Sequence, residues 1–76
     1  MTEVQWMKMF GDNLQTLLDE RHLTKSELSK LTGITKGAIS RYVAGKQMPT
    51  IRNAMYIADA FRITLDELVY FGDSID

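Results

Sequence analysis

Threonine residues mark the places where helices can begin in this chain. Thr2, Thr24 and Thr64 are each followed three residues later by Gln or Glu, and in this pattern the two side chains cap the first turn of a helix reciprocally. Thr35 and Thr50 each precede an apolar periodic segment and can act as simple N-caps. Five helix starts within 76 residues predict an all-α domain of short helices joined by short loops.

Apolar residues recur three and four positions apart after each start, which is the spacing of one helix face. Gly33 and Gly45 are expected to end the second and third helices, and Pro49 prevents the third helix from continuing into the fourth. The expected helices cover about 2–21, 24–31, 35–45, 50–61 and a last segment from residue 64. The residues expected to face the interior are Trp6, Phe10, Leu14, Leu17, Leu18, Leu28, Leu31, Ala38, Ile39, Tyr42, Ile51, Ala54, Met55, Ala58, Phe61, Leu65, Leu68 and Val69.

The composition excludes several classes of function. The chain has one histidine, His22, and no cysteine, so disulfides and thiolate metal sites are not available. We expect no metal, no cofactor and no catalytic residue, and therefore no enzyme. No apolar run approaches the ~18 residues of a membrane span, and the N-terminus lacks an apolar signal core. The sequence therefore predicts a cytoplasmic protein without a membrane partner.

The net charge of −1 hides an uneven distribution along the chain. Residues 21–52 contain seven basic residues and one acid, a net charge of +6. Residues 1–20 carry a net charge of −3, and residues 53–76 carry −4. A chance cluster of solvated charges is one interpretation, but a basic face directed at a polyanion explains this segregation better.

The most informative stretch is residues 24–49, where two short helices are joined by a tight turn containing Gly33. Ser29 is small at the point where the two helices would cross, so the backbones can approach closely. Ile34 and Ile39 can anchor the second helix to the core. This is the arrangement of a helix-turn-helix, in which the second helix lies in the DNA major groove.

From Phe10 to Val69 the sequence resembles the repressor/Cro-type (XRE-like, lambda-repressor-like) helix-turn-helix domains of phages and bacteria. The matching stretches are FGDNLQTLLDERHLT, KSELSKLTGIT, AISRYVAGKQMP and IADAFRITLDELV, in that order. The resemblance implies a compact five-helix bundle of a bacterial or phage-encoded protein, with the helix-turn-helix in helices 2 and 3. We take 1–76 as one domain, with its core at about 6–71, the helix-turn-helix at about 24–45 and a frayed tail at 72–76.

Several positions depart from the family pattern. Lys25 stands where members often carry Gln, and Ala44 stands where many carry Asn, which removes one polar backbone contact. Leu18 and Val43 replace a common Arg and Glu, so we expect a hydrophobic contact in place of an ion pair. Arg62 stands where a glycine often ends the fourth helix, and a left-handed backbone there would be mildly strained.

The resemblance places Lys36, Gly37 and Arg41 where the family reads bases, and helix geometry adds Ser40 on the same exposed side. Lys and Arg can donate to guanine O6 and N7, although such residues can also be no more than solvated surface charges. Gly37 could let the helix backbone approach DNA closely, or it could be a tolerated weak point of the helix. The candidates for phosphate contacts flank the two helices and are Thr24, Lys25, Thr35, Lys46, Gln47 and Arg52.

Apolar side chains also crowd both ends of the chain. Val69, Tyr70 and Phe71 are the candidates for a homodimer surface. The alternative is that the two termini pack locally against each other.

Together these patterns predict a sequence-specific, double-stranded DNA-binding transcriptional regulator, a repressor. We expect it to read the major groove with its third helix, as a dimer on a pseudo-palindromic operator. No small-molecule effector is expected if the chain is complete, whereas an excised piece would lack a C-terminal oligomerisation or sensor domain. The alternative function is a protein-interaction module, such as an antitoxin or anti-repressor, but the net charge of +6 over residues 21–52 favours DNA.

Overall fold

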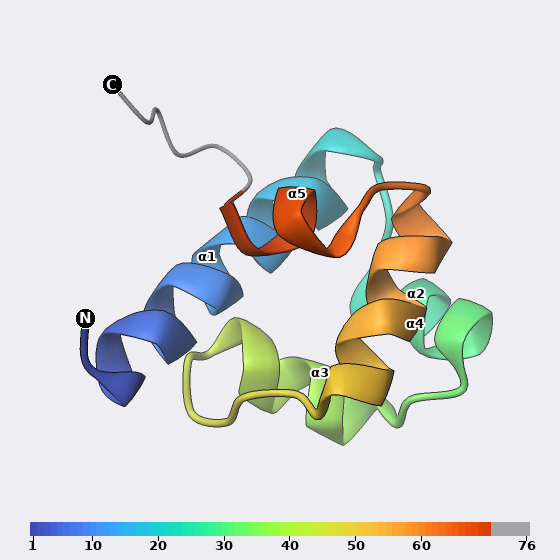
Figure 1. Ribbon diagram of the computed structural model, residues 1–76. Coiled ribbons are helices and arrows are strands. Elements are labelled where there is room, and N and C mark those ends of the chain that lie inside the picture. Colours follow the sequence, from blue (N-terminus) through green and yellow to red (C-terminus); the bar gives the residue numbers. More distant parts are fainter. Residues whose placement is uncertain (71–76) are drawn as a thin grey trace.

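The computed structural model describes residues 1–70, and these form five helices (Figure 1). They are α1 (Glu3–Glu20), α2 (Lys25–Thr32), α3 (Lys36–Val43), α4 (Ile51–Phe61) and α5 (Leu65–Tyr70). The expected all-α fold is therefore confirmed, and no strand occurs within residues 1–70. The predictions made for Phe71 and for the tail at 72–76 lie outside the described residues.

All five threonine caps form as the sequence predicts. Thr24 Oγ1 accepts from the backbone N–H of Glu27 at 3.1 Å, and Glu27 Oε1 accepts from the backbone N–H of Thr24 at 2.8 Å. The same reciprocal bonds open α1 at Thr2 and α5 at Thr64. Single bonds from Thr35 and Thr50 cap α3 and α4. These caps satisfy amide groups that would otherwise lack a partner in the first turn, so they fix where each helix starts.

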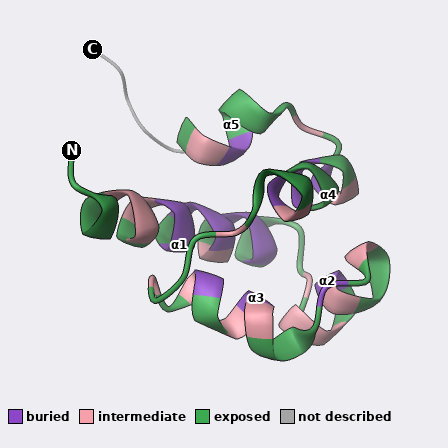
Figure 2. Ribbon diagram, turned by 60° about the horizontal axis from the view of Figure 1, so that its bottom comes forward, coloured by how far each residue is buried: buried purple, intermediate pink, exposed green. Residues whose placement is uncertain are grey.

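The helices enclose one apolar core. Helix α1 packs against α3 and α5, α2 packs against α3 and α4, and α4 also packs against α5 (Figures 1 and 2). Figure 2 shows the buried residues on the inner sides of the helices, with the outer side of α3 left exposed. The buried apolar residues are Phe10, Leu14, Leu17, Leu18, Leu28, Ile34, Ile39, Tyr42, Ala54, Ile57, Ala58, Phe61 and Leu68.

Four residues expected in the interior are exposed instead. Leu31 is 62% exposed because the inward line of the short helix α2 runs through Leu28 and Thr32, four residues apart. The buried side of α4 consists of Ala54, Ile57, Ala58 and Phe61. Ile51 and Met55 lie off this side and are 74% and 56% exposed. Helix α5 is short and buries one leucine, Leu68, in the core. Leu65 is 37% exposed at the start of the same helix.

Two departures from the family pattern have structural outcomes. Arg62 ends α4 with φ 59° and ψ 44°, so it takes the left-handed backbone conformation, which is unfavourable for a side chain with a Cβ. Leu18 is buried and Val43 is partly buried against the same core. A direct contact between Leu18 and Val43 stays a prediction.

Helices α1 and α3 approach each other closely at Gly11, a contact that the sequence pattern does not predict. A Cβ atom at Gly11 would lie 2.6 Å from the carbonyl oxygens of both Tyr42 and Val43. Helix α1 therefore meets the C-terminal half of α3 backbone to backbone, and no side chain larger than hydrogen fits between them. One turn earlier in α1, Lys8 Cα would lie 3.3 Å from a Cβ built on Gly45, just beyond the end of α3.

We expect Gly11→Ala to destabilise the fold by about 1–3 kcal/mol, because the new methyl group forces α1 and α3 apart. The matched control is Gly37→Ala in α3, where a Cβ meets only Arg41 Nη1, at an ordinary 3.5 Å. Gly37→Ala should be neutral or should stabilise by up to ~1 kcal/mol through helix propensity. Urea unfolding of both variants measures the two changes, and equal effects of the same sign would contradict the contact at Gly11.

Candidate nucleic-acid interface

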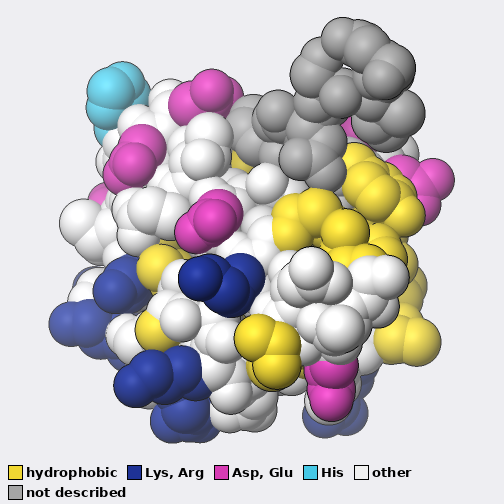
Figure 3. All heavy atoms as spheres, turned by 90° about the vertical axis from the view of Figure 1, so that its left-hand side faces the viewer, with side chains coloured by type: hydrophobic (Ala, Val, Ile, Leu, Met, Phe, Trp, Pro, Cys, Tyr) yellow, Lys and Arg dark blue, Asp and Glu magenta, His cyan; other side chains and the backbone are white. Residues whose placement is uncertain are grey.

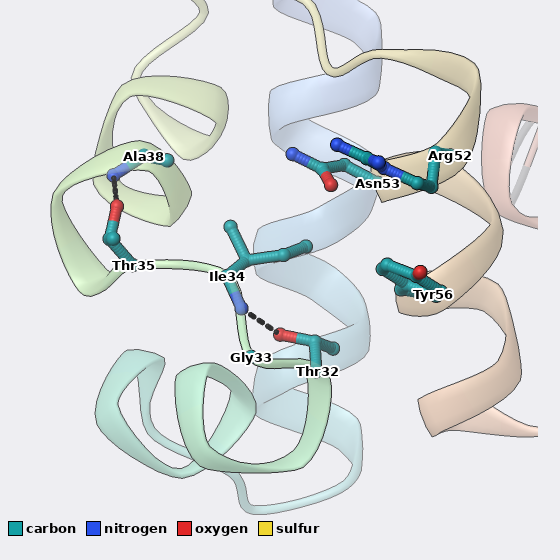
Figure 4. Close-up of a pocket in the computed structure, with 8 residues that line it drawn as sticks. All are labelled: Thr32, Gly33, Ile34, Thr35, Ala38, Arg52, Asn53 and Tyr56. Atoms are coloured by element: carbon teal, nitrogen blue, oxygen red, sulfur yellow. Dashed lines mark hydrogen bonds between the residues drawn. The ribbon is translucent and has the colours of Figure 1, made fainter.

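The turn between α2 and α3 is held by four local hydrogen bonds. Gly33 takes the expected left-handed conformation, with φ 79°, and its N–H donates to the carbonyl oxygen of Ser29 at 2.8 Å. The Ser29 hydroxyl donates to the Ile34 carbonyl oxygen at 2.5 Å, and Thr32 Oγ1 accepts from the Ile34 N–H at 3.1 Å. Thr35 Oγ1 then accepts from the Ala38 N–H at 3.2 Å (Figure 4). Ser29 therefore contributes more than the small size expected from the sequence, because its hydroxyl fixes the turn.

The inner side of α3 is fixed to the rest of the bundle. Ile39 and Tyr42 are buried, as expected from the sequence. The Tyr42 ring stands edge-on to Phe10, with the ring centroids 6.4 Å apart. The Tyr42 hydroxyl accepts from Asn53 Nδ2 at 3.0 Å, which ties α3 to α4. With its inner side held in this way, α3 presents a defined outer side to solvent.

Three of the four base-reading candidates lie on that outer side. Lys36, Gly37 and Arg41 are exposed, and Ser40 is half-buried. Arg41 Nε donates to Gln47 Oε1 at 2.7 Å. Arg41 Nη1 also lies 3.5 Å from the position of a Cβ on Gly37. The Arg41 guanidinium therefore lies beside Gly37, at ordinary contact distance for a methyl group at that position.

The phosphate candidates other than Thr35, the cap of α3, lie at three points around this helix. Lys25 is the first residue of α2 and is half-buried, beside the exposed cap Thr24. Lys46 and Gln47 are exposed in the loop that follows α3, and Arg52 is exposed in the first turn of α4. Their proposed phosphate contacts stay predictions.

A groove of about 320 Å³ separates the helix-turn-helix turn from α4 (Figure 4). It brings Arg52, from the first turn of α4, close to Thr35, the cap of α3. Asn53 and Tyr56 complete the α4 wall, and Thr32 to Thr35 with Ala38 form the opposite wall. Of the sequence-predicted phosphate candidates, the groove therefore joins two that lie 17 positions apart in the chain.

Charge is separated across the surface as well as along the sequence. Figure 3 shows Lys and Arg side chains gathered in the lower part of the view, on the side where α3 lies in Figure 1, with most of the acidic side chains above them.

Arg21, one of the seven basic residues in 21–52, also has a structural role, which the sequence pattern does not predict. Its Nη1 donates to the Phe61 carbonyl oxygen at 2.8 Å, and its guanidinium lies 5.9 Å from the centroid of the Phe61 ring.

Two of the dimer candidates, Val69 and Tyr70, contact α1. The Tyr70 ring, 43% exposed, stands edge-on to Trp6 with the ring centroids 6.0 Å apart. The Val69 carbonyl accepts from the side chain of Asn13, which is buried in α1. Local packing of the two termini, the alternative to a partner surface, therefore does occur at Trp6 and Tyr70. Phe71 lies outside the described residues.

Within residues 1–70, no group of three or more His, Cys, Asp or Glu residues is placed to hold a metal ion. None of the five described helices combines the length and apolar character needed to cross a membrane.

The fold and the exposed side of α3 define a helix-turn-helix domain. The sequence model of the helix-turn-helix family HTH_3 matches residues 14–68, and the chain belongs to this family. The resemblance stated from the sequence is thereby confirmed. The relatives that match are named as transcriptional regulators, a class of binding proteins rather than enzymes.

Two curated relatives are similar in sequence. The HTH-type transcriptional repressor RghR of Bacillus subtilis (strain 168) is 34% identical over 71 residues, which cover 92% of this chain and 53% of the relative. The HTH-type transcriptional activator BcrR of Enterococcus faecalis is 32% identical over 60 residues, which cover 79% of this chain and 29% of the relative. The chain thus spans about half of the first relative and less of the second.

Solved structures show the same fold. An HTH_3 family transcriptional regulator from Vibrio cholerae superposes with a TM-score of 0.87 at 24% identity, over 95% of this chain and 40% of that one. The restriction-modification controller protein C.AhdI from Aeromonas hydrophila gives a TM-score of 0.78 at 24% identity, over 82% of this chain and 94% of that one.

We expect Ser29→Ala to lower the free energy of unfolding by about 0.5–1.5 kcal/mol, because the Ile34 carbonyl loses its hydrogen-bond donor in a half-buried turn. Ser26→Ala, in the same helix, is the matched control and should change stability by less than ~0.5 kcal/mol. Chemical denaturation measures both variants. If Ser29→Ala were as harmless as the control, the hydroxyl would not be fixing the turn.

Proposed function

We propose that this chain is a sequence-specific, double-stranded DNA-binding transcriptional regulator that places α3 in the major groove. The observation that carries the proposal is the two-sided character of α3. Ile39 and Tyr42 hold its inner side in the core, while Lys36, Gly37 and Arg41 occupy its exposed outer side. In helix-turn-helix proteins, residues in the N-terminal part of this helix contact base edges, and Lys36 and Gly37 lie there, whereas Arg41 lies in the last turn of α3. The relatives' names, one a repressor and one an activator, support regulation of transcription.

The chemistry of the outer side suits a guanine-containing half-site. Arg41 and Lys36 carry only donors, and guanine presents two acceptors, O6 and N7, in the major groove. Ser40 is a further base-reading candidate, although it is half-buried. Thr24, Lys25, Thr35, Lys46, Gln47 and Arg52 are the proposed phosphate contacts, which would orient the domain without reading sequence.

We assign repression rather than activation to this domain. A protein bound at a promoter excludes other proteins from that DNA without any further contact, whereas activation needs a second surface that contacts another protein. Such a regulator would act in the cytoplasm of a bacterium. In vitro transcription from a template that carries the binding site decides between repression and activation. Bound protein lowers the transcript yield if the domain represses and raises it if the domain activates.

A homodimer on a pseudo-palindromic operator is part of the proposal. One recognition helix contacts only a few base pairs, which is too few for useful discrimination within a genome. Two helices related by a two-fold axis read half-sites about 34 Å apart, one turn of DNA. Exposed apolar side chains at Met1, Val4 and Tyr70 support a partner surface near Val69, Tyr70 and Phe71.

The rival function is a protein-interaction module, such as an antitoxin or an anti-repressor. The exposed apolar side chains Ile51, Met55 and Leu65, which lie outside α3, favour it. A module that binds only protein has no need for DNA affinity. A gel shift on random DNA at increasing salt therefore separates the two functions.

We expect Arg41→Ala and Lys36→Ala each to cost about 1–3 kcal/mol on the preferred site and to relax the preference for one base pair. Lys46→Ala is the control and should weaken binding to all sequences alike, reducing the salt slope by about one unit. Titrations on the preferred and on scrambled duplexes measure both effects. An equal loss on every sequence for Arg41→Ala would rule out its base-reading role.

We expect two protein chains to bind each operator, related by a two-fold axis. The selected site should therefore contain an inverted repeat. Selection from a random oligonucleotide pool gives the site, and analytical ultracentrifugation of the complex gives the stoichiometry. The free protein can be monomeric, since DNA can supply the pairing free energy. One chain per site, or a selected site without inverted symmetry, would contradict the dimer.

A further inference from the structure

We infer that Gln47 is a positioning residue for Arg41, and that it decides which N–H groups of the guanidinium face a base. This inference rests on the proposed function and adds to it a determinant of specificity outside α3. Gln47 lies in the loop after α3, six positions beyond Arg41. The sequence analysis assigned it only a possible phosphate contact.

The loop that carries Gln47 has a fixed conformation. At the end of α3, the Lys46 N–H donates to the Arg41 carbonyl oxygen at 3.0 Å, and the Gly45 N–H donates to the Tyr42 carbonyl oxygen at 3.1 Å. With Gly45 at φ 72°, these two bonds form a Schellman motif. Gly45 also lies against the backbone of Lys8 in α1. The loop therefore lies beside the last turn of α3, and this places Gln47 next to the Arg41 side chain.

One hydrogen bond holds the Arg41 side chain in place next to Gly37. Its Nε donates to Gln47 Oε1 at 2.7 Å, and its Nη1 lies over Gly37, where a Cβ would be at 3.5 Å. Gln47 supplies the hydrogen bond that keeps the guanidinium beside Gly37. An arginine fixed in this way loses less conformational freedom on binding than a free one.

The bond from Nε selects the binding edge of the guanidinium. Arginine has five N–H donors in a planar fork, and it can contact guanine with the Nε and Nη2 edge or with the Nη1 and Nη2 edge. Because Gln47 occupies Nε, the edge left for O6 and N7 of guanine is the one formed by Nη1 and Nη2. The base preference of Arg41 thus depends on a residue that need not touch a base.

The test is a double-mutant cycle of Gln47→Ala and Arg41→Ala, read as a ratio of affinities. The two probes are the duplex selected by the wild-type protein and the same duplex with the guanine that depends on Arg41 replaced by adenine. We expect Gln47→Ala to lower the wild-type preference about threefold to tenfold, and to have no further effect on it in the Arg41→Ala background. Gln47→Glu keeps an acceptor for Nε, so it should retain the preference even if its charge weakens binding to both duplexes.

Two outcomes would overturn the inference. One is an equal loss on both duplexes that persists in the Arg41→Ala background, which describes a phosphate contact. The other is a Gln47→Glu variant that loses the preference as Gln47→Ala does. A wild-type protein with no base preference would instead be a failure of the proposed function.

A measurement on the free protein keeps the inference testable in that case. The Nε–H proton of Arg41 should exchange slowly enough to give an NMR signal in the wild type and in Gln47→Glu, and the signal should broaden in Gln47→Ala. Identical exchange in all three proteins would overturn the positioning role without any DNA. Circular dichroism of each variant confirms that the helices are retained.

Discussion

The backbone contact between α1 and α3 at Gly11 is the constraint on which the rest of the structure depends. Two carbonyl oxygens of α3 lie so close to Gly11 that a methyl group would be 2.6 Å from both. A crossing this close sets the distance between the two helices and allows little rotation of α3. It also brings Tyr42 into the core, where its ring meets Phe10 and its hydroxyl meets Asn53. The outer side of α3 is therefore determined by contacts on its inner side.

The two ends of α3 are held by different local chemistry. At its start, Gly33 and the hydroxyl of Ser29 fold the turn that joins it to α2. At its end, Gly45 folds the loop back along the helix and places Gln47 beside Arg41. A helix fixed at both ends and along one side presents its side chains with little freedom, and preorganisation of this kind favours discrimination between similar base pairs.

The sequence predicted those features that depend on residues close together in the chain. Every threonine cap and the left-handed Gly33 were predicted, because each involves backbone groups within three or four residues. The prediction that Leu31 and Met55 are buried was wrong, because the neighbouring helices determine which side of a short helix is covered. The contact at Gly11 and the bond between Arg41 and Gln47 depend on how α1 and the loop after α3 fold against α3. Helical periodicity carries no signal for either.

The central claim is that α3 reads base edges in the major groove, and replacing single atoms of the DNA tests it most directly. A 7-deazaguanine lacks the N7 acceptor of the major groove, and an inosine lacks only the amino group that guanine shows in the minor groove. Affinity should be measured on the selected operator with each guanine replaced in turn. We predict a loss of about 1–3 kcal/mol for 7-deazaguanine at one position in each half-site, with inosine at that position tolerated. If inosine alone lowered the affinity and 7-deazaguanine were tolerated at every position, the claim that α3 reads base edges in the major groove would be contradicted.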